Sequence, residues 1–295
     1  MRTSPDRELL KGGIDFHAHP SPAIFPRLLD DSELANVAVD YGLRAVVIKD
    51  HDQITTGRAY YVNRMFPGVK TIGSLILNRS MGGLNPYVVE AALAYGTQVV
   101  FMPTNHSKWH QDYYGHSNYP GLVRTKPLVG EGITILGENG KLKPEVLTIL
   151  DLIAGSGVVL GTGHLHQEEV LSVVDEAVKR GVSKILVTHA NWALSKLSID
   201  VQKKLMGKGA LIEYVALTMV SPYFYEQKPI ELAEWIMEFK GENLVMSSDL
   251  GQVHGPPPPE GIRMALAALL QEGVPYEYLE KMTKVNPAKL LGLSL

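Results

Sequence analysis

Eight short apolar runs, rich in β-branched residues, alternate along this chain with segments of helical periodicity, and this alternation restricts the folds open to it. Most runs are continuously apolar, which is typical of strands buried on both faces of a parallel sheet. The runs span residues 13–18, 43–51, 69–77, 97–104, 158–164, 184–189, 210–217 and 243–249. Helical patterns lie between them at 31–41, 55–66, 86–95, 143–154, 167–180 and 229–240.

Strand–helix units that repeat at about 25–35 residues predict one α/β domain, a single (β/α)8 TIM-type barrel over residues 1–295. A doubly wound open sheet is the alternative. It is disfavoured because no Gly-rich phosphate-binding loop follows the first run.

The longest interruption of this rhythm is at residues 105–142, before the fifth run. Its first part, NHSKWHQDYYGHSNYPG, is rich in His and Tyr, and its second, ITILGENGKLKP, predicts a hairpin that turns at Asn139-Gly140. An insertion after strand four lies on the C-terminal face of a barrel, so we expect it to cover the active-site face. Its aromatic residues suit either a cap over an organic substrate or a contact in a homo-oligomer.

Composition excludes several kinds of site and partner. The chain has no cysteine, which excludes disulfides, thiolate zinc sites and cysteine nucleophiles. Its 28 basic and 31 acidic residues give a net charge of −3, without the strongly basic face that nucleic acid binding requires. No run has transmembrane length and the first residues lack an apolar signal region. We therefore expect a soluble, cytoplasmic protein with a small-molecule substrate and no nucleic acid or membrane partner.

Two histidines stand at the end of the first run, in GGIDFHAHPSP. His17 and His19 occupy alternate positions, so on a strand their side chains point to the same face. A second His-x-His pair, His164 and His166, is also present, and one such pair is weak evidence by itself. Strand-end histidines that hydrogen-bond to their neighbours are the alternative interpretation.

Further polar residues end other predicted strands. His164 ends the fifth strand, His189 the sixth and Asp249 the eighth. In a barrel these ends meet at one mouth, where the catalytic residues of this fold are found. Imidazoles with one carboxylate suit zinc, manganese, iron or nickel without any cysteine. The ordered set therefore predicts a metal site at the mouth of the barrel.

The motif G-x-I-D-F-H-A-H on the first strand, followed in order by these strand-end residues, resembles the amidohydrolase superfamily of metal-dependent hydrolases. The ending VNPAKLLGL is similar to the closing segment of many members. The resemblance spans the chain and implies a divalent transition metal, with zinc preferred, held by His17, His19, His164, His189 and Asp249. It also implies that Asp249 is the general base that takes a proton from metal-bound water.

The chain departs from this pattern at the fourth strand. Many members with two metal ions carry a carboxylated lysine or a glutamate there, whereas this strand ends VVFMPTNH. The second strand ends in Lys49-Asp50-His51 instead, and Glu213 lies on the seventh. We expect His51, as a further ligand, or Lys49 to reach the site, with a supporting role behind the ligands as the alternative. One and two bound ions are both compatible with this set.

Several other residues on or just beyond a strand end could face the substrate, or could equally face water. They are Lys49, Asn105, His106, Trp192, Glu213, Tyr214 and Gln252. Asp15 shares the face of His17 and could orient an imidazole, or could serve as a cap or ion-pair partner.

Together these features predict a metal-dependent hydrolase that cleaves an amide, cyclic amide, lactone or ester bond of a small molecule. Two alternatives use the same barrel: a phosphoesterase or nuclease-type hydrolase, and a mononuclear-metal decarboxylase. Arg58 and Arg79 would suit a small phosphorylated substrate. The non-enzymatic alternative is a metal-stabilised binding protein.

Overall fold

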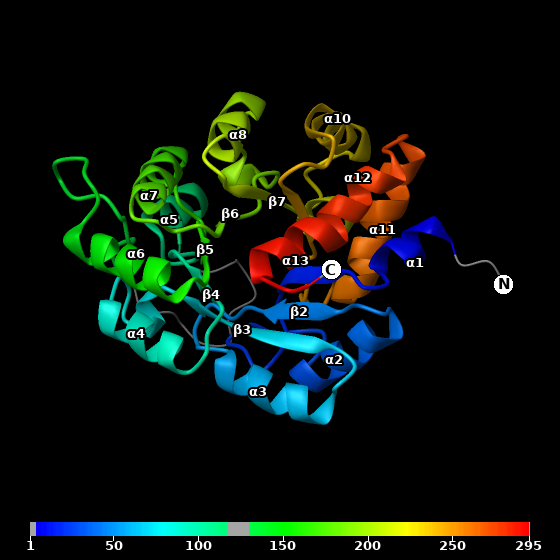
Figure 1. The fold of residues 1–295 in the computed structure, drawn as a ribbon, viewed down its shortest axis with the longest axis horizontal. Coiled ribbons are helices and arrows are strands. Elements are labelled where there is room, and N and C mark those ends of the chain that lie inside the picture. Colours follow the sequence, from blue (N-terminus) through cyan, green and yellow to red (C-terminus); the bar gives the residue numbers. More distant parts are fainter. Residues whose placement is uncertain (1–3, 117–129, 295) are drawn as a thin grey trace.

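Eight parallel strands form one sheet in the order β1 to β8 in the computed structural model, which describes residues 4–116 and 130–294 (Figure 1). The strands are β1 Ile14–Ala18, β2 Ala45–Ile48, β3 Lys70–Ile76, β4 Val99–Phe101, β5 Val159–Gly161, β6 Ile185–Val187, β7 Leu211–Val215 and β8 Leu244–Ser247. Each predicted apolar run contains one of them. The predicted (β/α)8 barrel is confirmed.

Helices surround the sheet, and the six predicted helical segments correspond to α2, α3, α4, α6, α7 and α10 (Figure 1). The α-helices are α1 Pro5–Leu10, α2 Asp31–Asp40, α3 Thr56–Met65, α4 Pro86–Ala94, α5 Lys108–Tyr114, α6 Pro144–Ser156, α7 Gln167–Lys179, α8 Ile199–Met206, α9 Leu217–Val220, α10 Pro229–Phe239, α11 Pro258–Gln271, α12 Tyr276–Glu280 and α13 Asn286–Leu291. Short turns of other helix types are η1 Arg79–Met81, η2 Ala193–Ser195 and η3 Lys281–Val285. Within the described ranges, no helix is both long and apolar enough to cross a membrane.

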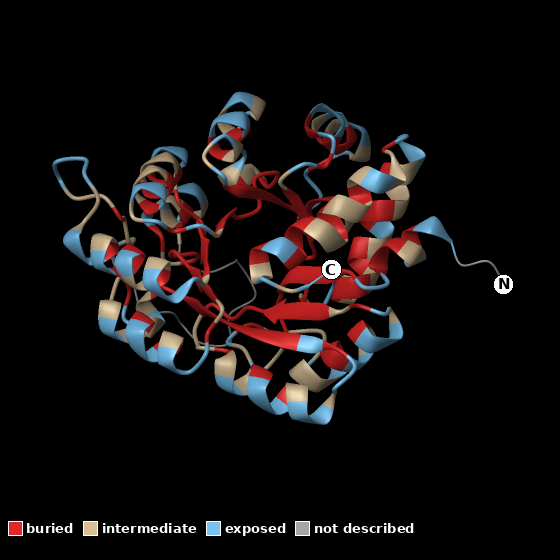
Figure 2. Cartoon of the chain, viewed as in Figure 1, coloured by how far each residue is buried: buried red, intermediate tan, exposed pale blue. Residues whose placement is uncertain are grey.

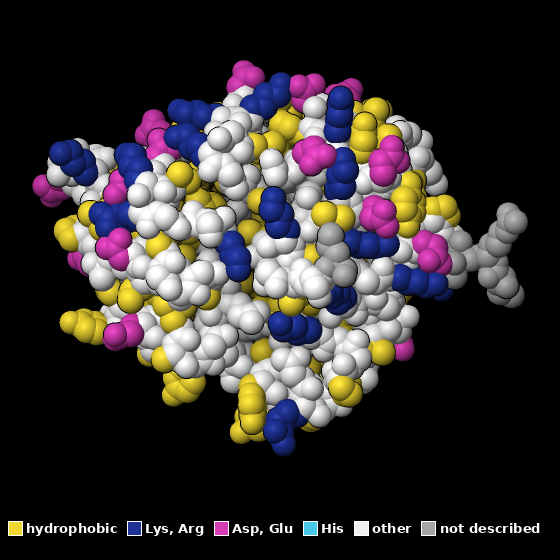
Figure 3. All heavy atoms as spheres, viewed as in Figure 1, with side chains coloured by type: hydrophobic (Ala, Val, Ile, Leu, Met, Phe, Trp, Pro, Cys, Tyr) yellow, Lys and Arg dark blue, Asp and Glu magenta, His cyan; other side chains and the backbone are white. Residues whose placement is uncertain are grey.

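The core has two parts, one between strands and helices and one inside the barrel. Figure 2 shows buried strands enclosed by helices whose outer faces are exposed. The inner part includes Ile14 and Leu211, the first residues of their strands, together with Ala288 and Leu290 of α13. Helix α13 therefore closes the end of the barrel where the strands begin, and the opposite end is left for a site. On the face drawn in Figure 3, basic and acidic side chains are intermixed.

The barrel closes between β1 and β8 just where the predicted ligands lie. The Asp249 N–H donates to the His17 carbonyl at 2.7 Å, and the His19 N–H donates to the Leu250 carbonyl at 2.9 Å. Ser248 adds a hydroxyl bond to the same His17 carbonyl at 2.7 Å. The ends of β1 and β8, more than two hundred residues apart in sequence, are thus held side by side.

The predicted insertion at 105–142 lies partly outside the described residues, because 117–129 are not described. Its helix α5 is fixed to the loop after β6, where the Trp109 Nε1–H donates to the Leu194 carbonyl at 2.6 Å. The expected hairpin is a tight turn around Asn139-Gly140 with one antiparallel bridge, between Leu136 and Leu142.

Candidate metal centre

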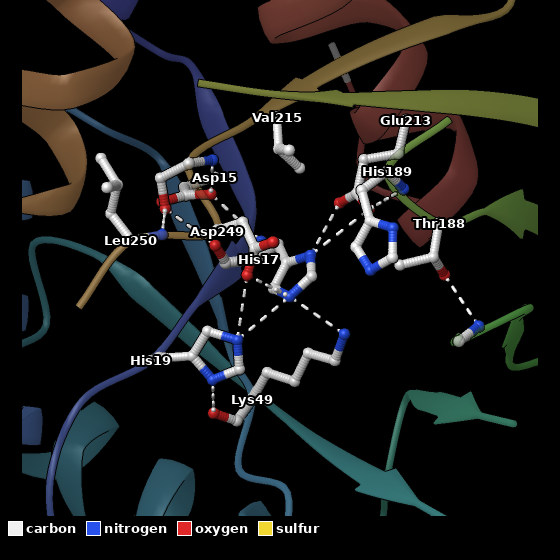
Figure 4. Close-up of polar contacts among 12 residues, drawn as sticks. Asp15, His17, His19, Lys49, Thr188, His189, Glu213, Val215, Asp249 and Leu250 are labelled. Carbon is white, nitrogen blue, oxygen red and sulfur yellow. Dashed lines mark hydrogen bonds and ion pairs between the residues drawn. The ribbon is translucent and has the colours of Figure 1, made fainter. Parts of the chain in front are cut away.

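Three of the predicted ligands meet at the C-terminal mouth of the barrel. His17 Nε2 and His19 Nε2 lie 3.0 and 3.1 Å from the same oxygen, Asp249 Oδ1. The two Nε2 atoms are 3.2 Å apart. All three side chains are buried, and their ligand atoms lie within 4.8 Å of one another (Figure 4). Two imidazoles and a carboxylate so placed form a donor set for a divalent metal.

Hydrogen bonds on the far side of each imidazole orient it toward this point. His19 Nδ1 lies 2.8 Å from the Lys49 carbonyl, which can only accept, so Nδ1 carries the proton. His17 Nδ1 lies 3.2 Å from Glu213 Oε1. A proton on Nδ1 leaves the Nε2 lone pair available for a metal, which is the usual arrangement of metal-binding histidines.

The protonation states of Asp249 and His19 favour a cation between them. Burial alone would raise the pKa of Asp249, but the charge of His17 and its hydrogen bond hold it well below its ordinary value. Burial lowers the pKa of His19 well below its ordinary value, so its ring is neutral. A lone pair on His19 Nε2 therefore faces an ionised carboxylate oxygen at 3.1 Å. A cation between them would relieve this repulsion, and the donor set fits a metal ion on that ground.

The pKa of His17 shifts in the opposite direction from that of His19. Burial would lower the pKa of His17, but the carboxylates of Asp249 and Glu213 outweigh burial and the opposing charge of Lys49, and they raise it. Burial also acts on Glu213, whose pKa is nevertheless lowered, mainly by His17. His17 thus lies between two ionised carboxylates, an environment that favours a positive charge at this position.

Backbone strain accompanies two of the predicted ligands. Asp249 and His189 have φ angles of 52° and 32°, in the left-handed region that residues other than glycine rarely adopt. Gly251 follows Asp249 with a φ of 142°, and a Cβ there would lie 2.0 Å from the His19 carbonyl oxygen. Such strain persists where surrounding structure enforces it, and it is common at functional sites.

His164 and His189 lie beside the three converging ligands, with ring centroids 4.8 Å apart. The His189 ring is 6.1 Å from that of His17, and neither of its nitrogens has a hydrogen-bond partner within the described part of the chain. His164 Nδ1 lies 2.9 Å from Nδ1 of His110 in α5. Burial lowers the pKa of His189 to about 3, so an unpaired, neutral imidazole faces the site. This is a second observation that fits a metal centre.

The structure also brings the end of β2 to this centre. Lys49 Nζ lies 2.9 Å from His17 Nε2 and 4.2 Å from the centre of the Phe101 ring. Burial lowers the pKa of Lys49 to about 8. The His51 ring stacks on His19 at 4.9 Å, and its Nδ1 is 2.9 Å from Thr104 Oγ1.

The remaining predicted residues fall in different places. Trp192 and Gln252 line a pocket that also contains His19, His51, His164 and Asp249. Asn105 is buried and His106 half-buried after β4, and Asn105 Oδ1 and His106 Nδ1 have no hydrogen-bond partner among residues 4–116 and 130–294. Burial, with a contribution from Arg79, lowers the pKa of His106 to about 4.

Tyr214, a candidate to face either the substrate or water, faces the helix layer instead. Its hydroxyl donates to Gln202 of α8 at 2.7 Å, and its ring packs against Trp235 of α10. Consecutive residues of a strand point to opposite faces, so the inward direction of Glu213 forces Tyr214 outward. His166, the other half of the second His-x-His pair, caps the N-terminus of α7.

One family model, described as "Family of unknown function (DUF6282)", matches residues 12–213, more than half of the chain. The chain belongs to DUF6282. The matched part of this DUF6282 chain includes His17, His19, His164 and His189, and it ends at Glu213. No curated protein matches the sequence.

Solved structures share the DUF6282 chain's fold at low sequence identity. An amidohydrolase from Pseudomonas aeruginosa has a TM-score of 0.66 at 13% identity over 98% of both chains. A lactonase from Listeria monocytogenes has a TM-score of 0.60 at 13% identity over 97% of both. A β-aspartyl dipeptidase from Fervidobacterium islandicum has a TM-score of 0.59 at 15% identity, over 96% of this chain and 75% of the other. These likenesses show that the chain shares its barrel fold with the three solved structures.

Two residues near the DUF6282 site were not singled out as site residues by the sequence. His110 belongs to the His- and Tyr-rich segment, and no local pattern indicates its contact with His164. Arg27 lies in an irregular loop after β1, yet it lines the pocket beside Gln252. Both contacts join residues far apart in sequence.

Proposed function

We propose that this chain is a metal-dependent hydrolase that cleaves an amide, cyclic amide, lactone or ester bond of a small molecule. The observation that carries the proposal is the convergence of His17 Nε2, His19 Nε2 and Asp249 Oδ1 on one point beside a pocket. The solved structures with this fold include an amidohydrolase, a lactonase and a β-aspartyl dipeptidase, whose names support the same class of reaction.

His17, His19 and Asp249 would hold the ion, with zinc preferred and manganese, iron or nickel as alternatives. When bound, a divalent metal would polarise a substrate carbonyl and lower the pKa of coordinated water to about 7. His164 and His189 would supply further ligands to the same ion or to a second one. His51 stacks on His19 and would support it or join the ligands.

The protein's own side chains would then handle protons and position. Asp249 lines the pocket and is ionised, so it is the carboxylate placed to accept a proton from the attacking water and to pass it to the leaving group. Glu213 would hold His17 in the tautomer that presents Nε2. Trp192 lines the pocket, so its ring would contact the substrate. Lys49 is buried and is not among the lining residues of the described chain, and its ammonium group would act on His17 Nε2, 2.9 Å away.

Phosphoester hydrolysis has less support. Arg58 forms ion pairs with Asp31 at 2.7 Å and Asp50 at 3.0 Å, which neutralise the guanidinium. Arg79 donates to the Glu131 carbonyl. These arginines are therefore occupied by partners within the chain.

The test begins with elemental analysis of protein purified without chelator, beside the double variant His17→Ala/His19→Ala. We expect about one or two equivalents of a transition metal, lost in the double variant. Absence of metal from the wild-type protein after incubation with zinc and with manganese contradicts the proposal. The count also distinguishes a mononuclear from a binuclear centre.

Activity is then measured on a lactone, a hydantoin, a β-aspartyl dipeptide and a carboxylic ester. Asp249→Asn should lower kcat by about 100-fold or more on the substrate that turns over, with a smaller change in metal content. If metal content and melting temperature fall together and no substrate turns over in the wild type, the site is that of a metal-stabilised binding protein.

A further inference from the structure

The pocket over the candidate metal centre has an apolar wall. Phe25, Trp192, Leu217, Phe224 and Val253 line it, and they come from the loops or short helix that follow β1, β6, β7 and β8. Trp192 packs edge-on against His189 at 4.9 Å and against Phe224 at 5.9 Å. An aromatic or branched aliphatic body would be desolvated against these side chains, which is the main source of affinity in small-molecule pockets.

One cationic side chain, Arg27, lies among these lining residues of the described chain, apart from the histidines. Its backbone forms an antiparallel bridge with Gln252, and the next N–H, of Leu28, donates to the Gly251 carbonyl at 2.8 Å. These bonds join the loop after β1 to the loop after β8. Through this pairing, Arg27 lies beside Gln252, which is three residues beyond Asp249 at the end of β8.

The Arg27 guanidinium also has a defined orientation and electrostatic reach. It lies 5.6 Å from the centre of the Phe25 ring, which restricts it on one side. Burial is the main cause that lowers the pKa values of His19 and His51, and the positive charge of Arg27 lowers them further. The field of Arg27 therefore extends across the pocket to the metal-binding histidines.

The lining residues of the described chain include one guanidinium, that of Arg27, and one carboxylate, that of Asp249. This carboxylate points to the candidate metal centre, because Asp249 Oδ1 lies 3.0 Å from His17 Nε2 and 3.1 Å from His19 Nε2. A single planar guanidinium beside an apolar wall matches a singly charged, planar carboxylate.

We infer that this pocket selects substrates with an aromatic or branched aliphatic body next to the bond that is cleaved. This body carries a carboxylate, which Arg27 binds. The inference rests on the proposed hydrolase function and names its substrate class. Arg27 is then a specificity-determining residue that contacts the substrate away from the reacting bond.

Binding of benzoate and of its neutral counterpart benzamide tests this without turnover. Isothermal titration calorimetry on the metal-loaded protein should give a Kd for benzoate at least about ten-fold lower than for benzamide. Arg27→Met should abolish this preference, and Arg27→Lys should retain part of it because the charge remains while the fork geometry is lost. Arg64→Met, at an exposed position on α3, is the matched control and should retain the full preference.

Two results would overturn the inference. One is benzoate binding no more tightly than benzamide to the wild type, including binding of neither. The other is a preference that survives in Arg27→Met with unchanged metal content, since the metal would then be the partner of the carboxylate. If Arg27→Met is poorly folded by its melting temperature, Arg27→Gln replaces it, and the same two criteria apply. An Arg27-dependent preference without hydrolysis of any panel substrate would contradict the hydrolase proposal alone.

Discussion

Glu213 connects two predicted metal ligands: its Oε1 lies 3.2 Å from His17 Nδ1, and its Oε2 accepts the His189 N–H at 3.0 Å. Strand β7 thus fixes the imidazole of one ligand and the strained backbone of the other. A glutamine at 213 has one acceptor oxygen for these two donors, so one bond is lost.

Glu213→Gln should therefore weaken metal binding by about 10–100-fold without unfolding the barrel. Competition with a chromophoric zinc chelator measures the change in Kd. Glu234→Gln, at an exposed position of α10, is the control and should bind as the wild type does. Equal affinities of the Glu213 and Glu234 variants would mean that Glu213 does not orient the ligands.

The two residues of the second His-x-His pair, His164 and His166, should have different functions. His164 is buried beside His189, whereas the side chain of His166 accepts the Glu168 N–H and caps α7. His164→Ala should lower the metal content of purified protein. His166→Asn should leave it unchanged, since asparagine is also a good N-cap. Elemental analysis of both variants decides, and comparable metal loss in the two would rule out this division.

Gly251 should be intolerant of any side chain. An added Cβ would meet the His19 carbonyl oxygen at 2.0 Å, whereas at Gly273, with a φ of 84°, nothing lies within 4 Å. Both Gly→Ala changes carry a backbone cost of about 1–2 kcal/mol, and the clash at 251 adds about 1–3 kcal/mol. Urea unfolding should therefore rank Gly251→Ala as less stable than Gly273→Ala, and metal content should fall only in the former. The reverse order would show that the loop after β8 moves freely away from His19.

Asp15 should make stability depend on pH in the metal-free protein. Its side chain is fully buried, and burial raises its pKa from 3.8 to about 6, although its Oδ1 accepts the His17 and Ser248 N–H groups. Between about pH 4 and 6 the folded carboxyl therefore binds more protons than the unfolded one. Its contribution to the free energy of unfolding then falls by about 3 kcal/mol in total as the pH rises from well below 4 to well above 6.

Asp15→Asn removes this titration and keeps an acceptor oxygen. In urea unfolding with chelator present, the variant should gain stability relative to the wild type on going from pH 4.5 to 7.5, by about 2 kcal/mol. Parallel pH profiles for the two proteins would show that the pKa of Asp15 is the same in the folded and the unfolded chain.

Local sequence patterns were enough to predict the barrel and the shared face of His17 and His19. Continuous apolar runs and helical periodicity depend on near neighbours, and all eight strands lie within the predicted runs. A period of two was enough to place His17 and His19 on one face. The same period allows only one of Glu213 and Tyr214 to face inward, but it does not say which.

Which strand-end residues meet depends on the packing of the whole barrel. The hydrogen bonds that close β1 against β8 bring Asp249 to His17 and His19, and the bridge between Arg27 and Gln252 carries a loop arginine into the pocket. Helix α5 likewise reaches His164 through His110. Distances between residues this remote in sequence depend on strand registers and loop packing around the whole barrel, which no local pattern specifies.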